Sequence, residues 1–477
     1  METFITSANR GSISTGYDID NSLKFESANT ESLTKSQTAS NRRTWTLSWW
    51  FKRTKVDADL QYMFHANVSS GNEFYLVING TSDFRIDDYA SGAQIRFHSG
   101  GSGESFRDSA AWYHVVIACD TTQSTEANRF KVYLNGVDLT AISGFFSTAQ
   151  YPSQNYDTHI NDSSSTLSIG KSISASTNFC GYMCEFNFID GLMKEVSDFG
   201  EFDSASGIWK PKEYTGSYGN QGYFLNFADS ANLGDDASGN GKNFTENNIT
   251  AADQSTDTCT NNFCTLNALI PYSVQSGSPV ISEGATYHNG SGNWTGMKGT
   301  IGFNKGKWYW ELQTNSGSGG DLIYGVQTVA IINNQSESTA TSAHNLKETA
   351  AWYVSGGHWI ADETSNRDDV HHSNVSHTIG NTVVYGIGLN MDDGEVTYYA
   401  NGSAITNMTA LDLDGLAGET VAPFCSVYNQ AVRWNLGGYT TISISSAATD
   451  ANGYGTFEYA PPSGYYALCS KNLAEFG

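Results

Sequence analysis

The stretches GTIGFNKGKWYWEL (299–312) and VVYGIGLNMDDGEVTYYANG (383–402) decide the fold. The first is a Trp-rich strand, and the second alternates apolar and polar residues before running into Asn-Gly. The same pattern occurs earlier in RRTWTLSWWFKRTK (42–55), WYHVVIACD (112–120) and FKVYLNG (130–136). Period-2 alternation closed by Asn-Gly is typical of a β-hairpin, because both turn residues tolerate a positive φ. The chain is therefore predicted to be all-β, with two antiparallel β-sandwiches in tandem.

Composition agrees with a folded, strand-rich protein. The 477 residues include 48 Gly, 26 Tyr and 24 Phe but only 7 Pro, and 13% are aromatic. A run of apolar residues with period 3.6 is missing, so helices should be few and short. Trp45, Trp49, Trp308 and Trp310 stand on amphipathic strands and are expected in the two cores. The seven cysteines, an odd number, do not suggest a disulfide framework and are expected as buried free thiols.

The charge balance excludes two kinds of partner. The net charge is −24, from 49 acidic and 25 basic residues spread along the chain. Nucleic acid and anionic membranes are bound by clustered Lys and Arg, so neither is expected as a partner. No stretch approaches the roughly 18 apolar residues of a membrane-spanning helix. The first residues, METFITSANRGSISTG, lack the basic and apolar regions of a signal peptide, and export by that route is not expected.

Changes in composition suggest four segments. Residues 1–16 are small and polar, and we expect them to be an attachment arm. The first sandwich is expected over 17–230 and the second over 271–477. Between them, residues 231–270 are rich in Asp, Asn, Gly and Thr, which is typical of a connector.

Several motifs carry a resemblance to known domains. SLKFESANTESL (22–33) and LNFADSANLGDDASGNGKNF (225–244), with the three early stretches quoted above, resemble laminin-G or concanavalin-A-like lectin domains of phage structural proteins. VAPFCSVYN (421–429) and FEYAPPSGYYALCSKNL (457–473), with the two stretches that opened this section, are similar to the SPRY domain. The resemblance implies a concanavalin-A-like jelly roll followed by a SPRY-like sandwich.

The resemblance also implies a role. It is that of a tailed-bacteriophage virion protein, made in the host cytoplasm and exposed on the particle as a tail fibre or another appendage that binds host glycan or surface protein. The arm would bind other virion proteins, and a trimer is the favoured homo-oligomer because weak glycan sites gain from avidity. A capsid or tail decoration or adaptor protein is the alternative, and a glycan depolymerase is a third possibility.

Catalysis is not expected. A glycosidase needs paired carboxylates on one side of the site. Glu185 and Asp190 are five residues apart, an odd offset that puts them on opposite faces of a strand. The sequence also lacks a Gly-x-Ser-x-Gly elbow, an HExxH motif and a phosphate-binding Gly-Lys-Ser/Thr loop. We therefore predict a protein without enzymatic activity.

Calcium is the metal considered, because lectin-like sandwiches often hold it in loops rich in oxygen ligands. The first candidates are Asp235, Asp236 and Asn240 in DDASGNG, and NMDDGE (390–395) and LDLDG (411–415) are similar strings. Acidic residues before Gly also serve simply as turn residues, which is the competing interpretation. No other cofactor is indicated.

A glycan site needs an aromatic face for the sugar ring beside polar groups for its hydroxyls. Loop residues of this kind occur in QYPSQNYD (150–157) and GGHWIADE (356–363). The candidate ligand-binding residues are Tyr151, Asn155, Tyr156, Asp157, His358 and Trp359. The competing interpretation for Trp359, and for the nearby Trp352, is that they fill the second core.

Overall fold

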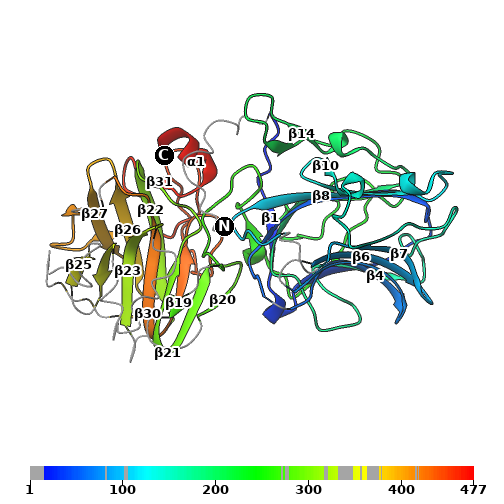
Figure 1. The fold of residues 1–477 in the computed structure, drawn as a ribbon. Helices are drawn as coiled ribbons and strands as arrows, with labels where there is room; N and C mark the ends of the chain where they lie inside the picture. The colour runs from blue at the N-terminus through cyan, green and yellow to red at the C-terminus, as the bar shows by residue number, and fades with distance from the viewer. Residues whose placement is uncertain are drawn as a thin grey trace. The chain divides into compact units, whose positions relative to one another are not determined.

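A computed structural model gives the fold (Figure 1), and it describes residues 16–57, 59–80, 83–100, 106–269, 272–273, 279–315, 321–330, 348–354, 357–361, 375, 377, 379–413, 416 and 418–477. The attachment arm predicted over residues 1–16 lies outside these residues except for Gly16. The described chain is nearly all β, with a single α-helix, α1 (Ser470–Phe476), so the predicted fold class is confirmed. Within the described ranges, no helix is both long and apolar enough to cross a membrane.

The chain divides into two compact units between Thr260 and Asn261. The first unit holds residues 16–107 and 111–260, and the second holds 108–110 and 261–477. Each unit has its own large core. The division falls inside the segment that was expected to separate the two sandwiches.

Two eight-stranded antiparallel sheets form the sandwich of the first unit. The sheet that we call the covered sheet runs in the order β10 (Val137–Asp138), β9 (Phe130–Leu134), β8 (Trp112–Asp120), β3 (Thr44–Arg53), β13 (Gly181–Asp190), β1 (Ser22–Phe25) and β18 (Gln254–Ser255), with β16 (Tyr223–Leu225) on β13. The other, the open sheet, runs β11 (Thr148–Gln150), β7 (Ala93–His98), β6 (Asp83–Ala90), β5 (Asn72–Asn79), β4 (Gln61–Ser69), β12 (Thr166–Ile169), β2 (Ser32–Ser36) and β17 (Thr245–Asn247).

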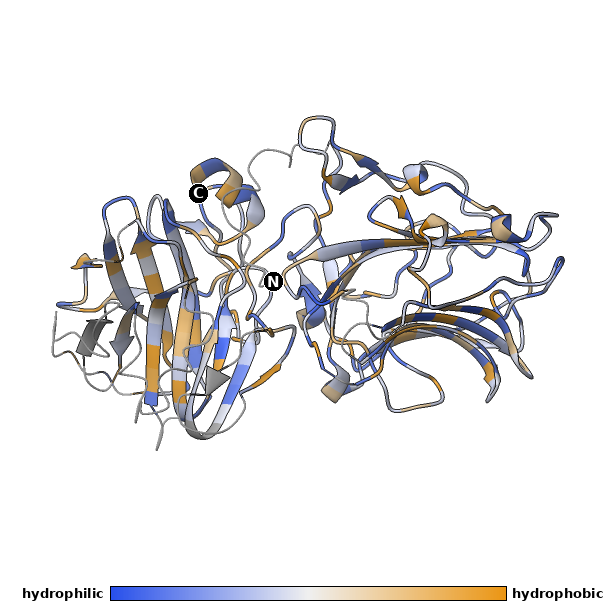
Figure 2. Cartoon of the chain, viewed as in Figure 1, coloured by the Kyte–Doolittle hydropathy of each residue, from blue (hydrophilic) through white to orange (hydrophobic). Residues whose placement is uncertain are grey.

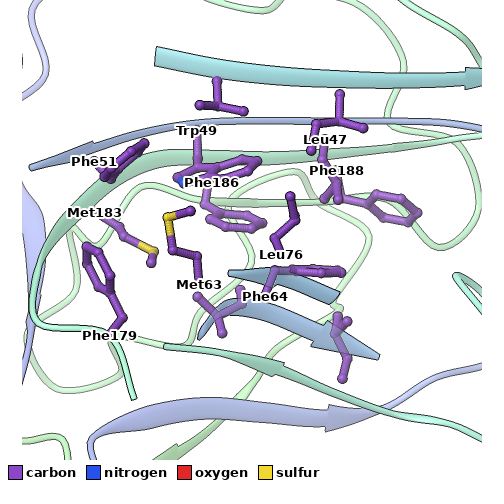
Figure 3. Close-up of a cluster of buried hydrophobic side chains, with 14 of the residues drawn as sticks. Leu47, Trp49, Phe51, Met63, Phe64, Leu76, Phe179, Met183, Phe186 and Phe188 are labelled. Carbon is purple, nitrogen blue, oxygen red and sulfur yellow. The ribbon is translucent and has the colours of Figure 1, made fainter. Parts of the chain in front are cut away.

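The core of the first unit lies between these sheets. Figure 3 shows Trp49 and Phe186 of the covered sheet near Phe64 of the open sheet. The ring of Phe186 stacks on Trp49 with 5.5 Å between centroids and on Phe64 with 6.1 Å. Trp45 and Trp49 are fully buried, as predicted. Figure 2 shows the bands of alternating hydropathy along the strands, which follow from side chains that point to opposite faces.

The covered sheet is also buried on its second face. The hairpin of β14 (Gly200–Phe202) and β15 (Trp209–Pro211) contributes Trp209, whose Nε1 donates to Nδ1 of His114 at 3.0 Å. Trp50 stacks on His114 with ring centroids 4.6 Å apart, and Ser48 Oγ lies 2.9 Å from His114 Nε2. Burial lowers the pKa of His114 to about 3, so this imidazole is neutral.

Residues 231–260 do not form the expected connector. Leu233, Phe244 and Ile249 are buried in the core of the first unit. In addition, β17 pairs with β2 and β18 pairs with β1. The segment completes the first unit because its three large apolar side chains are all placed in that core.

One extended sheet system forms the second unit, in a sandwich-like arrangement, and it is antiparallel except where its last strand pairs in parallel with β22. Its main order is β25 (Gly357–Ala361), β24 (Thr349–Tyr353), β23 (Asp321–Thr328), β30 (Val421–Asn435), β22 (Lys307–Thr314), β26 (Val384–Asn390), β27 (Glu395–Ala400) and β28 (Ser403–Ala404). The remaining strands are β19 (Tyr272–Ser273), β20 (Val280–Ser282), β21 (Tyr287–Lys298), β29 (Leu411–Asp412) and β31 (Tyr466–Ala467). Trp308, Trp310, Trp352 and Trp434 are all fully buried, so Trp352 fills the core.

Both predicted Asn-Gly turns are present. Asn135 and Gly136 have φ of 46° and 84° between β9 and β10, and Asn401 and Gly402 have 46° and 74° between β27 and β28. A positive φ at both central residues is the requirement of the tight hairpin turn that matches strand twist.

Candidate functional site

The outer face of the open sheet carries the candidate site. Along β5, the core-facing Phe74 and Leu76 alternate with Glu73 and Tyr75, which are half-buried on the other face. The same alternation in β4, β6 and β7 adds polar and aromatic side chains to that face. Its central members are Tyr62, His65, Glu73, Tyr75, Asp87, Tyr89, Arg96 and His98.

Three tyrosines form a row across neighbouring strands of this face. Tyr62 in β4 lies beside Tyr75 in β5, with ring centroids 5.5 Å apart. Tyr75 in turn lies beside Tyr89 in β6, at 6.2 Å and with the ring planes only 17° apart. All three side chains are half-buried. The tyrosine row, as we call these residues, therefore presents adjacent aromatic surfaces from three strands.

Asp87 fixes the polar groups beside the tyrosine row. Its Oδ1 accepts from Arg96 Nε at 2.9 Å, and its Oδ2 lies 2.7 Å from His98 Nε2. Burial alone would raise the pKa of Asp87, but the hydrogen bonds from His98 and Arg96, with one from Tyr75, outweigh it and hold the pKa below its ordinary value. Arg96 also lies over the ring of Tyr89, with its guanidinium carbon 5.1 Å from the centroid. The carboxylate is ionised and its partners are held in place.

A second carboxylate lies on the same face. Glu73 Oε2 accepts from Asn67 Nδ2 at 2.9 Å and lies 3.0 Å from His65 Nε2. The hydrogen bond from His65 is the main reason that the pKa of Glu73 is lowered. Both acids are thus held in the ionised form, and neither is suited to protonate a leaving group. This arrangement favours binding over bond cleavage.

Glu185 and Asp190, the pair considered for glycosidase chemistry, belong to separate hydrogen-bond networks. Glu185 Oε2 accepts from Tyr17, whereas Asp190 Oδ1 accepts from Asn161 Nδ2 at 2.8 Å. Glu185 is only 8% exposed. The geometry does not bring the two carboxylates to one accessible site.

The loop tyrosines proposed from the sequence are anchored to the fold. Tyr156 donates from its hydroxyl to Oδ1 of the buried Asp88 at 2.7 Å, and Tyr151 packs edge-on against Phe97 at 5.0 Å between centroids. Burial, followed by the charge of Asp88, raises the pKa of Tyr156. Both tyrosines are half-buried, so part of each ring is accessible.

The structure describes the side chains of only two of the other four candidates, Asn155 and Asp157. Asn155 is exposed with φ of 60°, a typical conformation for Asn in a turn. Asp157 is also exposed and pairs with Arg43 Nε at 2.7 Å. His358 and Trp359 belong to β25, where they pair with Trp352 and Ala351 of β24, and their side chains lie outside the described structure.

The three calcium candidates serve as turn residues. Asp236 accepts from the backbone amides of Phe224 and Ser238 through Oδ1 and from Lys242 through Oδ2. Asp235 accepts from Asn243, and Asn240 donates to the carbonyls of Gly219 and Gly222. The part of the chain that is described contains no group of three or more His, Cys, Asp or Glu side chains placed to hold a metal ion.

Sequence reasoning missed the tyrosine row. The sequence predicts a glycan site in loops, whereas the row lies on strands β4, β5 and β6. The available signal was the position of Tyr75 in NEFYLVIN (72–79). It lies between the apolar Phe74 and Leu76, so its side chain is expected on the face of the strand opposite the core.

Comparison with known proteins identifies both domains. Residues 25–195 match the concanavalin A-like lectin/glucanases superfamily, and residues 307–439 match the SPRY domain. The protein therefore consists of a concanavalin-A-like domain followed by a SPRY domain, as the sequence motifs predicted. No curated protein matches this chain at a significant level.

Solved structures resemble single parts of the chain. One is the heptameric SAP-like pentraxin of Limulus polyphemus, at 16% identity over 37% of this chain and 80% of the pentraxin, with a TM-score of 0.26. Another is the SPRY domain of human HERC1, at 16% identity over 33% of this chain and 91% of that domain, with a TM-score of 0.24. A third is the CBM40 of the Ruminococcus gnavus IT-sialidase bound to α2,3-sialyllactose, at 16% identity over 30% and 75% of the two chains, with a TM-score of 0.22.

Proposed function

We propose that this protein is an exposed appendage of a tailed bacteriophage, such as a tail fibre, and that it binds host-surface glycan without cleaving it. The phage setting rests on the sequence motifs of both domains. Binding is assigned to the outer face of the open sheet. The arm of residues 1–16 would attach the protein to other virion proteins. In a trimer, three weak glycan sites would act together and bind the host surface more tightly than one.

The tyrosine row is the observation that carries the binding proposal. Sugar rings stack their apolar faces on aromatic side chains, and each such contact contributes about 1 kcal/mol. Asp87, Arg96 and His98 lie beside the rings, and Arg96 and His98 are already fixed by their hydrogen bonds to Asp87. Groups that are ordered in advance lose little entropy when a ligand binds.

The ionised state of both carboxylates on this face supports binding without hydrolysis. Glu73 and Asp87 have lowered pKa values, whereas a glycosidase needs one carboxyl that keeps its proton near neutral pH. A depolymerase would accordingly need another site. Incubation of purified protein with host polysaccharide, followed by a reducing-end assay, should show no release of new chain ends.

The test replaces two members of the tyrosine row. Tyr75→Ala and Tyr89→Ala are expected to weaken glycan-array binding and phage adsorption several-fold each. Tyr428→Ala is the matched control, because Tyr428 is a 36% exposed tyrosine on a strand of the second unit. Unchanged binding by both row variants, with normal melting curves, would refute the assignment to this face.

The same experiment separates the rival sites and roles. Tyr151→Ala and Tyr156→Ala test the loop predicted from the sequence. If only these loop variants lose binding, the glycan site is the loop and not the open sheet. If no variant changes adsorption while the protein still joins particles, a decoration or adaptor role replaces host recognition.

A further inference from the structure

Three ionisable side chains meet in a buried position on the covered sheet of the first unit. Lys24 Nζ lies 2.8 Å from Oε1 of Glu31 and 2.9 Å from Oδ1 of Asp253. The three side chains are 1%, 2% and 8% exposed, in that order. We call these residues the Lys24 triad. In this triad, one amine is held against two carboxyl groups away from bulk water.

The register of the sheet brings the amine and the second carboxyl group together. β1 pairs with β18, with Leu23 opposite Gln254, and Lys24 and Asp253 are the next residues along these two segments. Because Leu23 and Phe25 belong to the core, Lys24 points to the opposite face of the sheet. The contact therefore joins the first strand of the unit to its last segment.

Both carboxyl groups are fixed by the backbone. Glu31 Oε2 accepts from the amide of Glu26 at 2.7 Å, while its Oε1 faces Lys24. Asp253 Oδ2 accepts from the amide of Thr250 at 2.8 Å, while its Oδ1 faces Lys24. Groups that are held in contact in this way react faster than free ones, because their orientation is already fixed.

The triad contains one more acid than base. Two carboxylates beside one ammonium would leave an unbalanced negative charge in a buried position, which is costly. Burial, opposed by the charge of Lys24, raises the pKa of Glu31 to about 7, so this carboxyl can take up and release a proton near neutral pH. Burial also favours proton transfer from the ammonium of Lys24 to a carboxylate, because both groups then become neutral. A neutral amine is a nucleophile, and a neutral carboxyl group is the form that it attacks.

We propose that Lys24 and Asp253 join in an amide cross-link that the folded protein forms without another enzyme. Nζ of Lys24 attacks Cγ of Asp253, so that a C–N bond forms and the bond from Cγ to one carboxyl oxygen breaks. Glu31 accepts a proton from Nζ and passes it to the leaving oxygen, which departs as water. One ammonium and one carboxylate thus give one amide and one water, and the step needs no oxidant or reductant.

A second buried pair provides an internal comparison. Lys52 Nζ lies 2.9 Å from Asp257 Oδ2, and both side chains are as buried as the Lys24 triad. The other oxygen of Asp257 accepts from Trp112 Nε1 at 3.2 Å. An indole N–H donates a hydrogen bond but does not carry protons between groups as a carboxyl does. This pair is therefore expected to remain an ion pair.

The cross-link would close a covalent loop around most of the first unit. Lys24 and Asp253 lie near the two ends of that unit, which are residues 16 and 260 of the described chain. A force that pulls on these ends would pass through the amide and would leave residues 25–252 folded. The cross-link does not depend on the glycan binding proposed above.

Mass spectrometry of the full-length protein tests the proposal. Protein kept for several days at neutral pH should be lighter than the mass calculated from its sequence by about 18 Da, the mass of one water. After denaturation, trypsin should leave Lys24 uncut and release residues 11–35 joined to residues 243–298. Residues 44–52, which end at Lys52, should be released as a separate peptide.

Two variants test the roles of the acids. Glu31→Gln keeps the reacting pair but removes the proton carrier, and it should slow cross-linking at least about a hundredfold. Asp253→Ala removes the attacked carbon and should abolish the water loss. The exposed Glu126→Gln is the matched control and should cross-link like the wild type.

Three results would overturn the proposal. They are a wild-type mass equal to that of the sequence, a water loss located outside the peptides that contain Lys24 and Asp253, and an unchanged rate of cross-linking in Glu31→Gln. If a variant fails to fold, the peptide map of the wild type alone decides whether the amide is present.

Discussion

Tyr17 donates a hydrogen bond from its hydroxyl to Oε2 of Glu185 across 2.8 Å, joining residues 168 positions apart in the sequence. Glu185 has φ of 54° and sits where β13 shifts register against β3, in a β-bulge between Cys184 and Asn187. Glu185 is a non-glycine residue in the left-handed region, a conformation that persists only when the surroundings impose it. Here the bulge and the hydrogen bond from Tyr17 hold it.

The buried Glu185 should make stability depend on pH. Burial, with a smaller effect of the Glu213 charge, raises the pKa of Glu185 to about 7. An unfolded glutamate has a pKa near 4.3, so the folded protein binds more protons between these values and the free energy of unfolding falls as pH rises through this range. Glu185→Gln should therefore be more stable than the wild type at pH 8, by at most about 4 kcal/mol.

Urea titrations at pH 4 and pH 8 measure this difference. The two proteins should agree near pH 4, where the wild-type carboxyl is neutral. The exposed Glu126→Gln is the control and should follow the wild type at both pH values. A Glu185→Gln variant that is less stable at pH 8 would mean that the charged form is the one that the fold stabilises.

The ion pair between Lys52 and Asp257 should be sensitive to removal of one partner. Lys52 Nζ lies 2.9 Å from Asp257 Oδ2, and the two side chains are 0% and 1% exposed. Asp257→Ala would leave a buried ammonium group without its counter-charge and should lower the free energy of unfolding by about 3–5 kcal/mol.

A surface pair provides the comparison. Asp157→Ala removes the partner of Arg43, whose side chain is 42% exposed, and should change the free energy of unfolding by less than about 1 kcal/mol. Chemical denaturation of both variants measures the contrast. Equal effects would contradict the assignment of Lys52 and Asp257 to a desolvated pair.

In the second unit, Glu311 holds the C-terminal segment to β22. Its carboxylate accepts from the backbone amides of Glu458 at 2.9 Å and Tyr459 at 2.8 Å, and Asn435 Nδ2 donates to it at 2.9 Å. Glu311→Ala should lower the free energy of unfolding by about 3 kcal/mol, since hydrogen bonds to charged groups are lost. Hydrogen exchange should show reduced protection at residues 458 and 459, and unaltered protection there would refute this role.

The arm of residues 1–16 is predicted to serve attachment rather than folding. A short polar terminus has too few apolar groups to stabilise a core. Its deletion should leave the circular dichroism spectrum and both melting transitions unchanged, yet remove the protein from assembled particles. Incorporation of the truncated protein at the normal level would disprove the prediction.

Local sequence patterns predicted the strands and the Asn-Gly turns because alternation and turn chemistry act over a few residues. They did not predict that residues 231–260 belong to the first unit. Leu233, Phe244 and Ile249 are scattered among polar residues, so the composition of the segment as a whole is polar. The tyrosine row depends on cross-strand register, which places Tyr75 beside Tyr89 although 14 positions separate them. Register is a property of the whole sheet and cannot be derived from one strand.

The contrast between the covered and open sheets has an evolutionary consequence. Residues such as Trp50 and His114 are buried on the second face of the covered sheet, so substitutions there disturb folding. Half-buried positions such as Tyr62 and Tyr89 lie outside the core, so substitutions there cost less stability than core substitutions. Single substitutions on the open sheet can therefore change which ligand is bound, while the two sheets and their core stay the same.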